Sequence, residues 1–149
     1  MTTQILERHA LEAAPVAGGS GRLKIGIISS GWGSSGYYSD QVLENAATAK
    51  VFPAGTHMYF DHPSETEMYD RPERSVRDLA AVLETDGVWD PETKTIVGEA
   101  QVFGPYRELL TDEHFAKAIG TSIIASAEVT TGEAEGRKVE PMRDIVMLM

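Results

Sequence analysis

Cysteine is absent from the 149-residue chain, and this absence narrows the chemistry that the chain can perform. Without thiols it forms no disulfides, holds no metal through thiolates and has no cysteine nucleophile. No apolar run approaches the roughly 20 residues that a membrane-spanning helix needs. Residues 1–22 also lack the basic start and apolar core of an export signal. We therefore expect a soluble, unexported protein that does not bind a membrane.

Basic residues are scarce relative to acidic ones. The chain has 13 lysines and arginines against 23 aspartates and glutamates, so its net charge is −10. A surface of this sign repels the phosphate backbone of nucleic acids and anionic lipid headgroups. The sequence therefore argues against nucleic acid as a partner, and the acidic excess is explained most simply as a solvated surface.

The length of the chain corresponds to one domain with a sizeable core. We expect residues 1–22 to form a flexible N-terminal tail, because they end in the glycine-rich stretch 17–21. A short helix over 5–13 is compatible with the sequence but has little to pack against. Residues 23–149 then form the folded domain.

Apolar patterns predict an α+β domain with mostly antiparallel strands. A cap at Ser39 or Asp40 followed by an apolar stripe predicts a helix to about Lys50. Pro105 opens a second helical segment that reaches residue 118, with a break near 111–112. Runs of apolar or alternating residues predict strands over 23–29, 58–60, 77–84, 96–103, 122–129 and 139–149.

The segments between these elements predict loops. Residues 64–74 are charged and contain proline, which is typical of a mobile surface loop, and residues 130–138 predict a hairpin loop. Two turn signals, at Asp86 and Asp90, predict a hairpin before the strand at 96–103. The glycine- and serine-rich loop at 30–36 lacks the lysine of a phosphate-binding loop, so we expect no nucleotide site.

Two residues on separate elements form the candidate site. His62 follows an apolar stretch and stands in a turn closed by Pro63, and Ser122 opens an apolar strand sixty residues later. A serine hydroxyl attacks a carbonyl only when a neighbouring base takes its proton, and histidine is the most frequent base. His62 and Ser122 are therefore the minimum set for acyl transfer.

Each histidine and the serine also has a plainer explanation. A histidine before proline is usually a turn residue, and a serine after Gly120 may be no more than the start of a strand. His57 lies five residues before His62, so on a strand it faces the other way, and we expect it to be structural. His114 has acidic neighbours in sequence, but consecutive residues do not share a helix face, which argues against a metal site.

A third catalytic residue is not identified. If the strand at 139–149 returns beside the Ser122 strand, the expected register puts Ser122 opposite Met147, which cannot orient an imidazole. The nearest acids on that strand are Asp144, about 10 Å along the strand from Ser122, and Glu140, which lies farther still. Both are weak candidates for the missing member.

Four segments carry a resemblance to a known family. Each matches in residue type and order the capsid maturation (prohead) proteases of tailed bacteriophages, and together the likeness covers most of residues 23–149. That group is similar in fold to the herpesvirus assemblins. The matching segments are residues 55–63, 71–79, 102–106 and 119–125.

The resemblance implies a serine endopeptidase on a small, mostly antiparallel β-barrel with flanking helices. It implies Ser122 as nucleophile, His62 as base and no cofactor. The partners would be the scaffolding protein, the major capsid protein and possible second copies of the chain in a homodimer. The place of action would be the host cytoplasm, inside the viral procapsid. The family's third residue, a histidine or an acid on the next strand, has no match here, so we expect a C-terminally shortened protease domain.

Two other functions fit the same residues. The competing function is a protease-like capsid assembly module whose serine and histidine are idle. A small acidic β-barrel that binds a host partner is the third reading. Oxyanion donors are also open: backbone amides near Ser122 are the first choice, with Arg137 and Arg143 as outside candidates.

Overall fold

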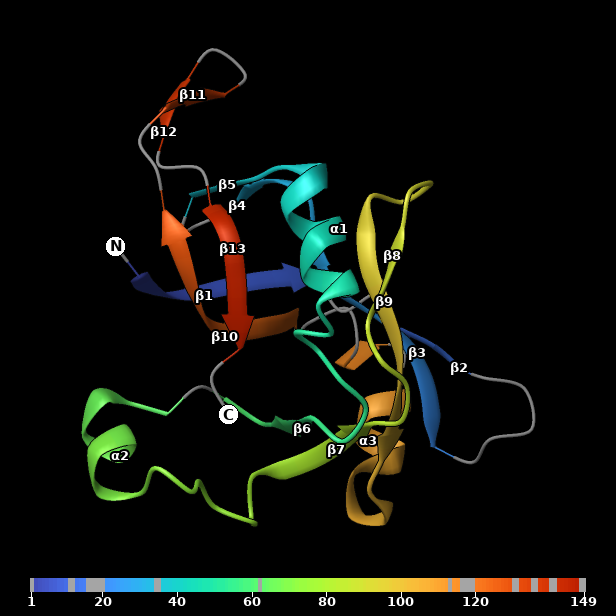
Figure 1. Cartoon of the computed structure of the whole chain (residues 1–149). Helices are drawn as coiled ribbons and strands as arrows, with labels where there is room; N and C mark the ends of the chain where they lie inside the picture. The colour runs from blue at the N-terminus through green and yellow to red at the C-terminus, as the bar shows by residue number, and fades with distance from the viewer. Residues whose placement is uncertain are drawn as a thin grey trace.

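The computed structural model describes residues 2–10, 13–15, 21–33, 36–61, 63–112, 114–115, 120–129, 132–134, 137–139 and 142–147. The fold is α+β, and every strand pair is antiparallel (Figure 1). This confirms the predicted class. Among the residues described, the strand pairing does not close either larger sheet into a barrel.

The larger sheet follows the order β2-β3-β9-β7-β6, and β8 also pairs with β9. Apolar side chains of β3 and β9 face the core, because strand residues alternate between the two faces. Ile96, Ala100 and Val102 are buried on β9, as the alternation in the sequence predicts. The strands are β2 (Ala13–Pro15), β3 (Arg22–Ser29), β6 (His57–Tyr59), β7 (Leu79–Leu83), β8 (Val88–Asp90) and β9 (Thr95–Val102).

A second sheet of three strands has the order β1-β10-β13. Its strands are β1 (Thr2–Ala10), β10 (Gly120–Val129) and β13 (Met142–Met147). Two short hairpins complete the strands: β4 (Gly31–Gly33) with β5 (Gly36–Tyr38), and β11 (Gly132–Ala134) with β12 (Arg137–Val139).

The main helix, α1 (Asp40–Thr48), forms where the sequence predicts it. The Ser39 hydroxyl accepts a hydrogen bond from the Val42 amide at 3.2 Å, which satisfies one of the free amides at the helix start. Leu43 and Ala46 lie one helical turn apart and are both buried in the core. The helix lies beside β13 in Figure 1.

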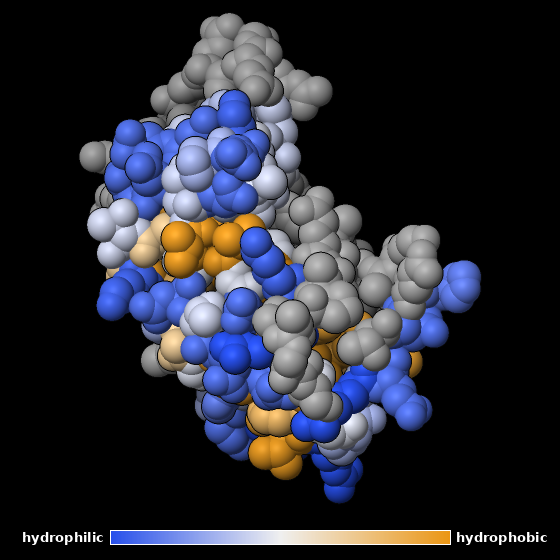
Figure 2. All heavy atoms as spheres, turned by 90° about the vertical axis from the view of Figure 1, so that its right-hand side faces the viewer, coloured by the Kyte–Doolittle hydropathy of each residue, from blue (hydrophilic) through white to orange (hydrophobic). Residues whose placement is uncertain are grey.

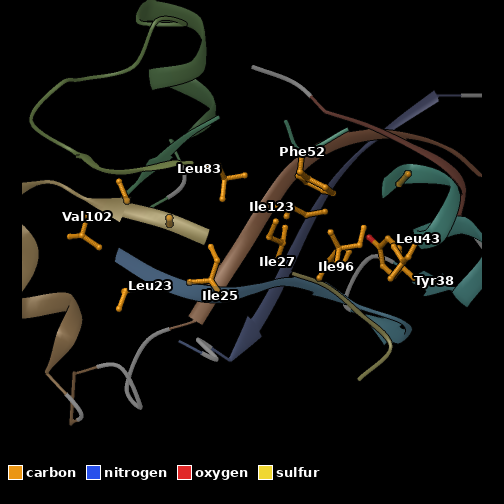
Figure 3. Packing of buried hydrophobic residues seen from close by; sticks show 14 residues of the cluster. Leu23, Ile25, Ile27, Tyr38, Leu43, Phe52, Leu83, Ile96, Val102 and Ile123 are labelled. Carbon is orange, nitrogen blue, oxygen red and sulfur yellow. The ribbon is translucent and has the colours of Figure 1, made fainter. Parts of the chain in front are cut away.

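Ile123 joins the two sheets. It lies on β10 of the three-stranded sheet, yet it is only 5% exposed and belongs to the same core cluster as Ile27 and Phe52. Figure 3 shows its side chain among these residues. Ile123 follows Ser122 directly on the strand. Its burial therefore fixes the part of β10 that carries the proposed nucleophile.

The N-terminal segment differs from the expected tail. Residues 2–10 form β1, which pairs with β10 along its whole length, and β2 pairs with β3. The helix considered for residues 5–13 is therefore wrong. An edge of β10 supplies hydrogen-bond partners for β1, and a partner that is more than a hundred residues away is invisible to local sequence patterns.

Residues 64–74 also differ from the predicted loop, since they contain helix α2 (Glu65–Asp70). The Ser64 hydroxyl accepts from the Glu67 amide at 3.2 Å, and the Glu67 carboxylate accepts from the Ser64 amide at 2.8 Å. This reciprocal pair is a capping box, and it stabilises a short helix that buries no side chain. In Figure 1 α2 projects away from the two sheets.

The second helical segment is confirmed where it is described. It begins with the 3-10 turn η1 (Gly104–Tyr106) and continues as α3 (Arg107–Thr111). The predicted break falls at Asp112, whose carboxylate accepts from the Phe115 amide at 2.8 Å. Residues 116–118 of the predicted helix lie outside the described residues.

The predicted antiparallel pairing of the strands at 77–84 and 96–103 is confirmed, since β7 pairs with β9. Their connection contains a further strand, β8, so the turn near Asp90 joins β8 to β9 and Asp86 lies between β7 and β8. The predicted loop at 130–138 contains the paired strands β11 and β12.

Most of the coloured surface in Figure 2 is hydrophilic, and its apolar areas are small and separate. The coloured part of this face therefore presents no broad apolar area. No helix in the described part of the chain is long and apolar enough to cross a bilayer.

Asp86 holds the connection between α1 and β6. Its carboxylate accepts from the Ala54 amide at 2.8 Å and lies 3.5 Å from the Lys50 ammonium. The Ala54 hydrogen bond, helped by Lys50, lowers the pKa of Asp86 below its ordinary value of 3.8. A carboxylate with a lowered pKa stabilises the folded state above that ordinary value. The contribution is lost as the pH falls through the lower folded-state pKa.

We expect Asp86→Asn to lower the melting temperature slightly at pH 7, because the amide keeps an acceptor but loses the charge. The difference from the wild type should shrink as the pH falls below 3.8 and vanish below the lower folded-state pKa, where the wild-type carboxylate is also protonated. Thermal unfolding followed by circular dichroism between pH 3 and pH 7 measures this. A difference that grows toward low pH would contradict the assignment.

Ile123→Ala should destabilise the protein by about 2–5 kcal/mol, since it removes buried apolar atoms and leaves a cavity between the sheets. The matched control is Leu109→Ala on α3, where the side chain is 42% exposed and the change should cost less than about 1 kcal/mol. Urea unfolding measures both. Equal effects of the two substitutions would show that β10 is not anchored through Ile123.

Candidate functional site

The proposed nucleophile lies near the start of β10. Ser122 is the third residue of the strand, and its register partner on β1 is Arg8. Directly opposed residues of an antiparallel pair have Cα atoms about 4.5–5.5 Å apart. The next residue, Ile123, is buried in the core. The Ser122 backbone is thus held by a strand neighbour on one side and by the core through the adjacent residue.

The proposed base, His62, lies outside the described residues, but both of its neighbours are described. Two residues, Phe60 and Asp61, separate it from the end of β6. The Phe60 amide donates to the Asp78 carbonyl at 2.8 Å, and the Phe60 ring packs edge-on against Tyr106 at 4.9 Å between centroids. The approach of the His62 imidazole to the Ser122 hydroxyl stays a prediction.

Both ends of the segment after β6 are tied to the body of the protein. The Tyr106 hydroxyl donates to the Arg77 carbonyl at 2.6 Å, close to the Phe60–Asp78 bond. The two ends of this segment therefore lie side by side. Tyr106 contacts both of them, through the Phe60 ring at one end and the Arg77 carbonyl at the other. Residue 62 stands at the beginning of this closed excursion.

An arginine contact holds the backbone directly before His62. The Arg74 guanidinium donates to the Asp61 carbonyl at 2.9 Å and lies over the Tyr59 ring at 4.2 Å from its centroid. Asp61 and Arg74 both have left-handed backbone conformations, with φ of 57° and 66°. Aspartate adopts this conformation more readily than most residues, and Arg74 adopts it at the end of a turn that its amide closes on the Arg71 carbonyl at 3.1 Å.

The observed register corrects the predicted position of the third catalytic residue. Met147 pairs with Ala125, not with Ser122, and Asp144 pairs with Glu128. The partners of residues 125–128 have thus moved by three residues from the predicted register, and the partner of Val129, beyond the bulge, by two. Glu128 is six residues from Ser122, so Asp144 lies about 20 Å along the strand, twice the expected distance. Asp144 is therefore a poorer candidate than the sequence suggested.

The turn that precedes β13 explains this shift. The hairpin of β11 and β12 is centred between residues 135 and 136, later than expected, and a bulge follows Glu128. Either change alters which residues face each other. Glu140, the other candidate acid, lies outside the described residues.

The arginines considered as oxyanion donors lie at the other end of β10. Arg143 precedes Asp144 on β13, and Arg137 lies on β12 beyond the bulge. The register brings Arg8 to Ser122 instead. Sequence patterns do not predict Arg8 as a neighbour of Ser122, because the glycine-rich stretch 17–21 indicates a flexible tail and the strand signal around Arg8 is weak.

The remaining histidines do not form a metal site in the described part of the chain, where no group of three or more potential ligands gathers. His57 is exposed on β6, and its Nδ1 lies 3.4 Å from the Tyr59 hydroxyl. The structural role expected of His57 stays a prediction. His114 is exposed next to α3.

The chain was compared with protein-family models, with curated protein sequences and with solved structures. None of the three comparisons found a match. The resemblance to phage maturation proteases therefore stays a prediction, and the function of this chain has to be argued from its own residues.

Proposed function

We propose that the chain is a serine endopeptidase of the capsid-maturation kind, with Ser122 as nucleophile and His62 as general base. The observation that carries the proposal is that each residue adjoins a firmly held piece of backbone. Ser122 precedes the buried Ile123, and His62 follows the carbonyl that Arg74 binds. Catalytic groups must be held in place by the surrounding structure, because a small displacement of a reacting group strongly lowers the reaction rate.

In the proposed mechanism the Ser122 oxygen attacks the scissile peptide carbonyl while His62 takes the hydroxyl proton. The tetrahedral intermediate then collapses, the C–N bond breaks, and His62 gives the proton to the leaving amine. Water, deprotonated by His62, attacks the resulting ester, and the serine hydroxyl is restored. The mechanism uses no cofactor. Backbone amides near Ser122 would bind the oxyanion.

The proposal includes the finer features of the family likeness. The two sheets would belong to a barrel-like arrangement with flanking helices. The substrates would be the scaffolding protein, the chain itself and the major capsid protein, inside a procapsid in the host cytoplasm. Packing enzyme and substrate in one shell raises their effective concentration, so a weakly active enzyme would suffice.

A second candidate is a protease-like assembly module without activity. It is favoured by large apolar side chains exposed after β6: Tyr69 is 92% exposed and Val76 is 85% exposed. Exposed apolar groups of this size suit contacts with another protein. In this alternative Ser122 and His62 would be present but idle.

Ser122→Ala and His62→Ala should each lower the processing of co-expressed scaffold by at least about 10³-fold, because nucleophile and base act as a unit. Labelling by a serine-directed phosphonate should be lost in Ser122→Ala and strongly slowed in His62→Ala. The matched control is Ser126→Ala on the same strand, which should label and process within about twofold of the wild type.

Processing at the wild-type rate in Ser122→Ala would contradict the peptidase proposal. If neither the wild type nor any variant is labelled while capsids still assemble only in the presence of the chain, the assembly module is the correct function.

A further inference from the structure

Residues 63–77, the excursion that follows β6, leave most of their side chains in contact with water. Residues 64–73 are exposed without interruption. Two large apolar side chains are among the exposed groups: Tyr69 is 92% exposed and Val76 is 85% exposed. The helix that carries Tyr69, α2, buries none of its side chains. Apolar groups of this size are stabilised when another surface covers them and removes them from water.

The backbone of the excursion is ordered by its own hydrogen bonds. The capping box of Ser64 and Glu67 holds the start of α2. The Arg74 amide then closes a turn on the Arg71 carbonyl at 3.1 Å, and Tyr106 contacts the chain at both ends of the segment. A segment that is ordered before it binds loses less conformational entropy on binding. The exposed side chains are thus presented on a preformed backbone.

Charges of opposite sign are separated along the excursion. Its first half, residues 63–70, has three acidic residues and no basic one, so its net charge is −3. Its second half, residues 71–77, has three arginines and one glutamate, so its net charge is +2. Tyr69 belongs to the acidic half and Val76 to the basic half. Each half therefore combines one exposed apolar group with an excess of one charge.

Much of this charge is available to a partner. Glu65, Asp70 and Arg77 make no ion pair with any residue that the structure describes. Arg71 lies 3.9 Å from Glu73, but its side chain is 61% exposed, and such surface pairs contribute little. Both halves can therefore form ion pairs with another molecule.

The separation of charge decides which partner fits. A partner of one charge sign would be attracted by one half of the excursion and repelled by the other. A fitting partner presents both signs in the reverse order, each beside an apolar group. A second copy of the chain does so when a two-fold axis passes through the middle of the excursion, because the acidic half of each copy then faces the basic half of the other.

We propose that the excursion is the surface through which two copies of this chain form a symmetric dimer. Tyr69 and Asp70 of one copy contact Val76 and Arg77 of the other, and the two-fold axis repeats this contact. The apolar groups form the centre of the interface and the charged groups surround it. The surface is small, so we expect a weak dimer with a dissociation constant of about 1–100 µM. The inference goes beyond the peptidase proposal and does not depend on it.

The first test removes the apolar contacts and measures the dimerisation of the full chain by analytical ultracentrifugation, at concentrations up to about 1 mM. Tyr69→Ser and Val76→Ser should each raise the dissociation constant at least about tenfold, because they remove the centre of the interface. The matched control is Val88→Ser on β8, where the side chain is 60% exposed but lies outside the excursion. This control should stay within about twofold of the wild type.

The second test reverses the charges of each half separately. The acid-reversed variant is Glu65→Lys with Asp70→Lys, and the base-reversed variant is Arg71→Glu with Arg77→Glu. Each should dimerise at least about tenfold more weakly than the wild type, because both halves of the excursion then carry the same sign. An equimolar mixture of the two variants should form a mixed dimer, and all four substitutions in one chain should restore the dimer.

The control for net charge is Glu44→Lys with Glu92→Lys. Both residues are exposed outside the excursion, and the double substitution changes the net charge by the same amount as in the acid-reversed variant. It should not weaken the dimer. Circular dichroism should show the same fold in every variant, since the substituted side chains are exposed.

Three results would overturn the inference. The first is a wild type that stays monomeric at the highest concentration, which would leave contact with a different protein as the reason for the exposed apolar groups. The second is a dimer that Val88→Ser weakens as much as Val76→Ser does. The third is a mixture of the two charge-reversed variants that forms no mixed dimer.

Discussion

Burial of one isoleucine side chain between two sheets is the constraint on which the rest of the structure depends. Ile123 is carried by the three-stranded sheet but packs in the cluster formed mainly by the six-stranded sheet and α1. Apolar burial of this kind is worth a few kcal/mol per side chain and has no direction of its own. The orientation of β10 across the core is set by β1 and β13, which pair with it on either side.

The proposed site combines this strand with a loop of a different character. β10 is held by packing and by a ladder of hydrogen bonds, whereas the segment after β6 is held by a few polar contacts around exposed residues. Loops supported by a rigid scaffold often carry catalytic residues. In the proposed function the nucleophile lies on the packed strand, and the base belongs to the segment after β6.

Sequence patterns predicted the elements whose causes are local. The Ser39 cap and the stripe through Leu43 suffice for α1, and alternation suffices for β9. The capping box at Ser64 and Glu67 was an equally local signal, yet the charge of that segment outweighed it. β1 could not be found in this way because its partner is distant, and the β10–β13 register depended on a bulge that alternation does not encode. The proposed site residues came from motif and likeness.

The central claim is that residues 62 and 122 meet, and the absence of cysteine makes a direct measurement possible. A His62→Cys, Ser122→Cys double variant is treated with a short thiol crosslinker that becomes fluorescent only when both ends react. The account predicts a fluorescent, crosslinked chain, as for the register partners Arg8→Cys and Ser122→Cys, and none for Tyr69→Cys with Ser122→Cys. Crosslinking of the Arg8 pair without crosslinking of the His62 pair would contradict it.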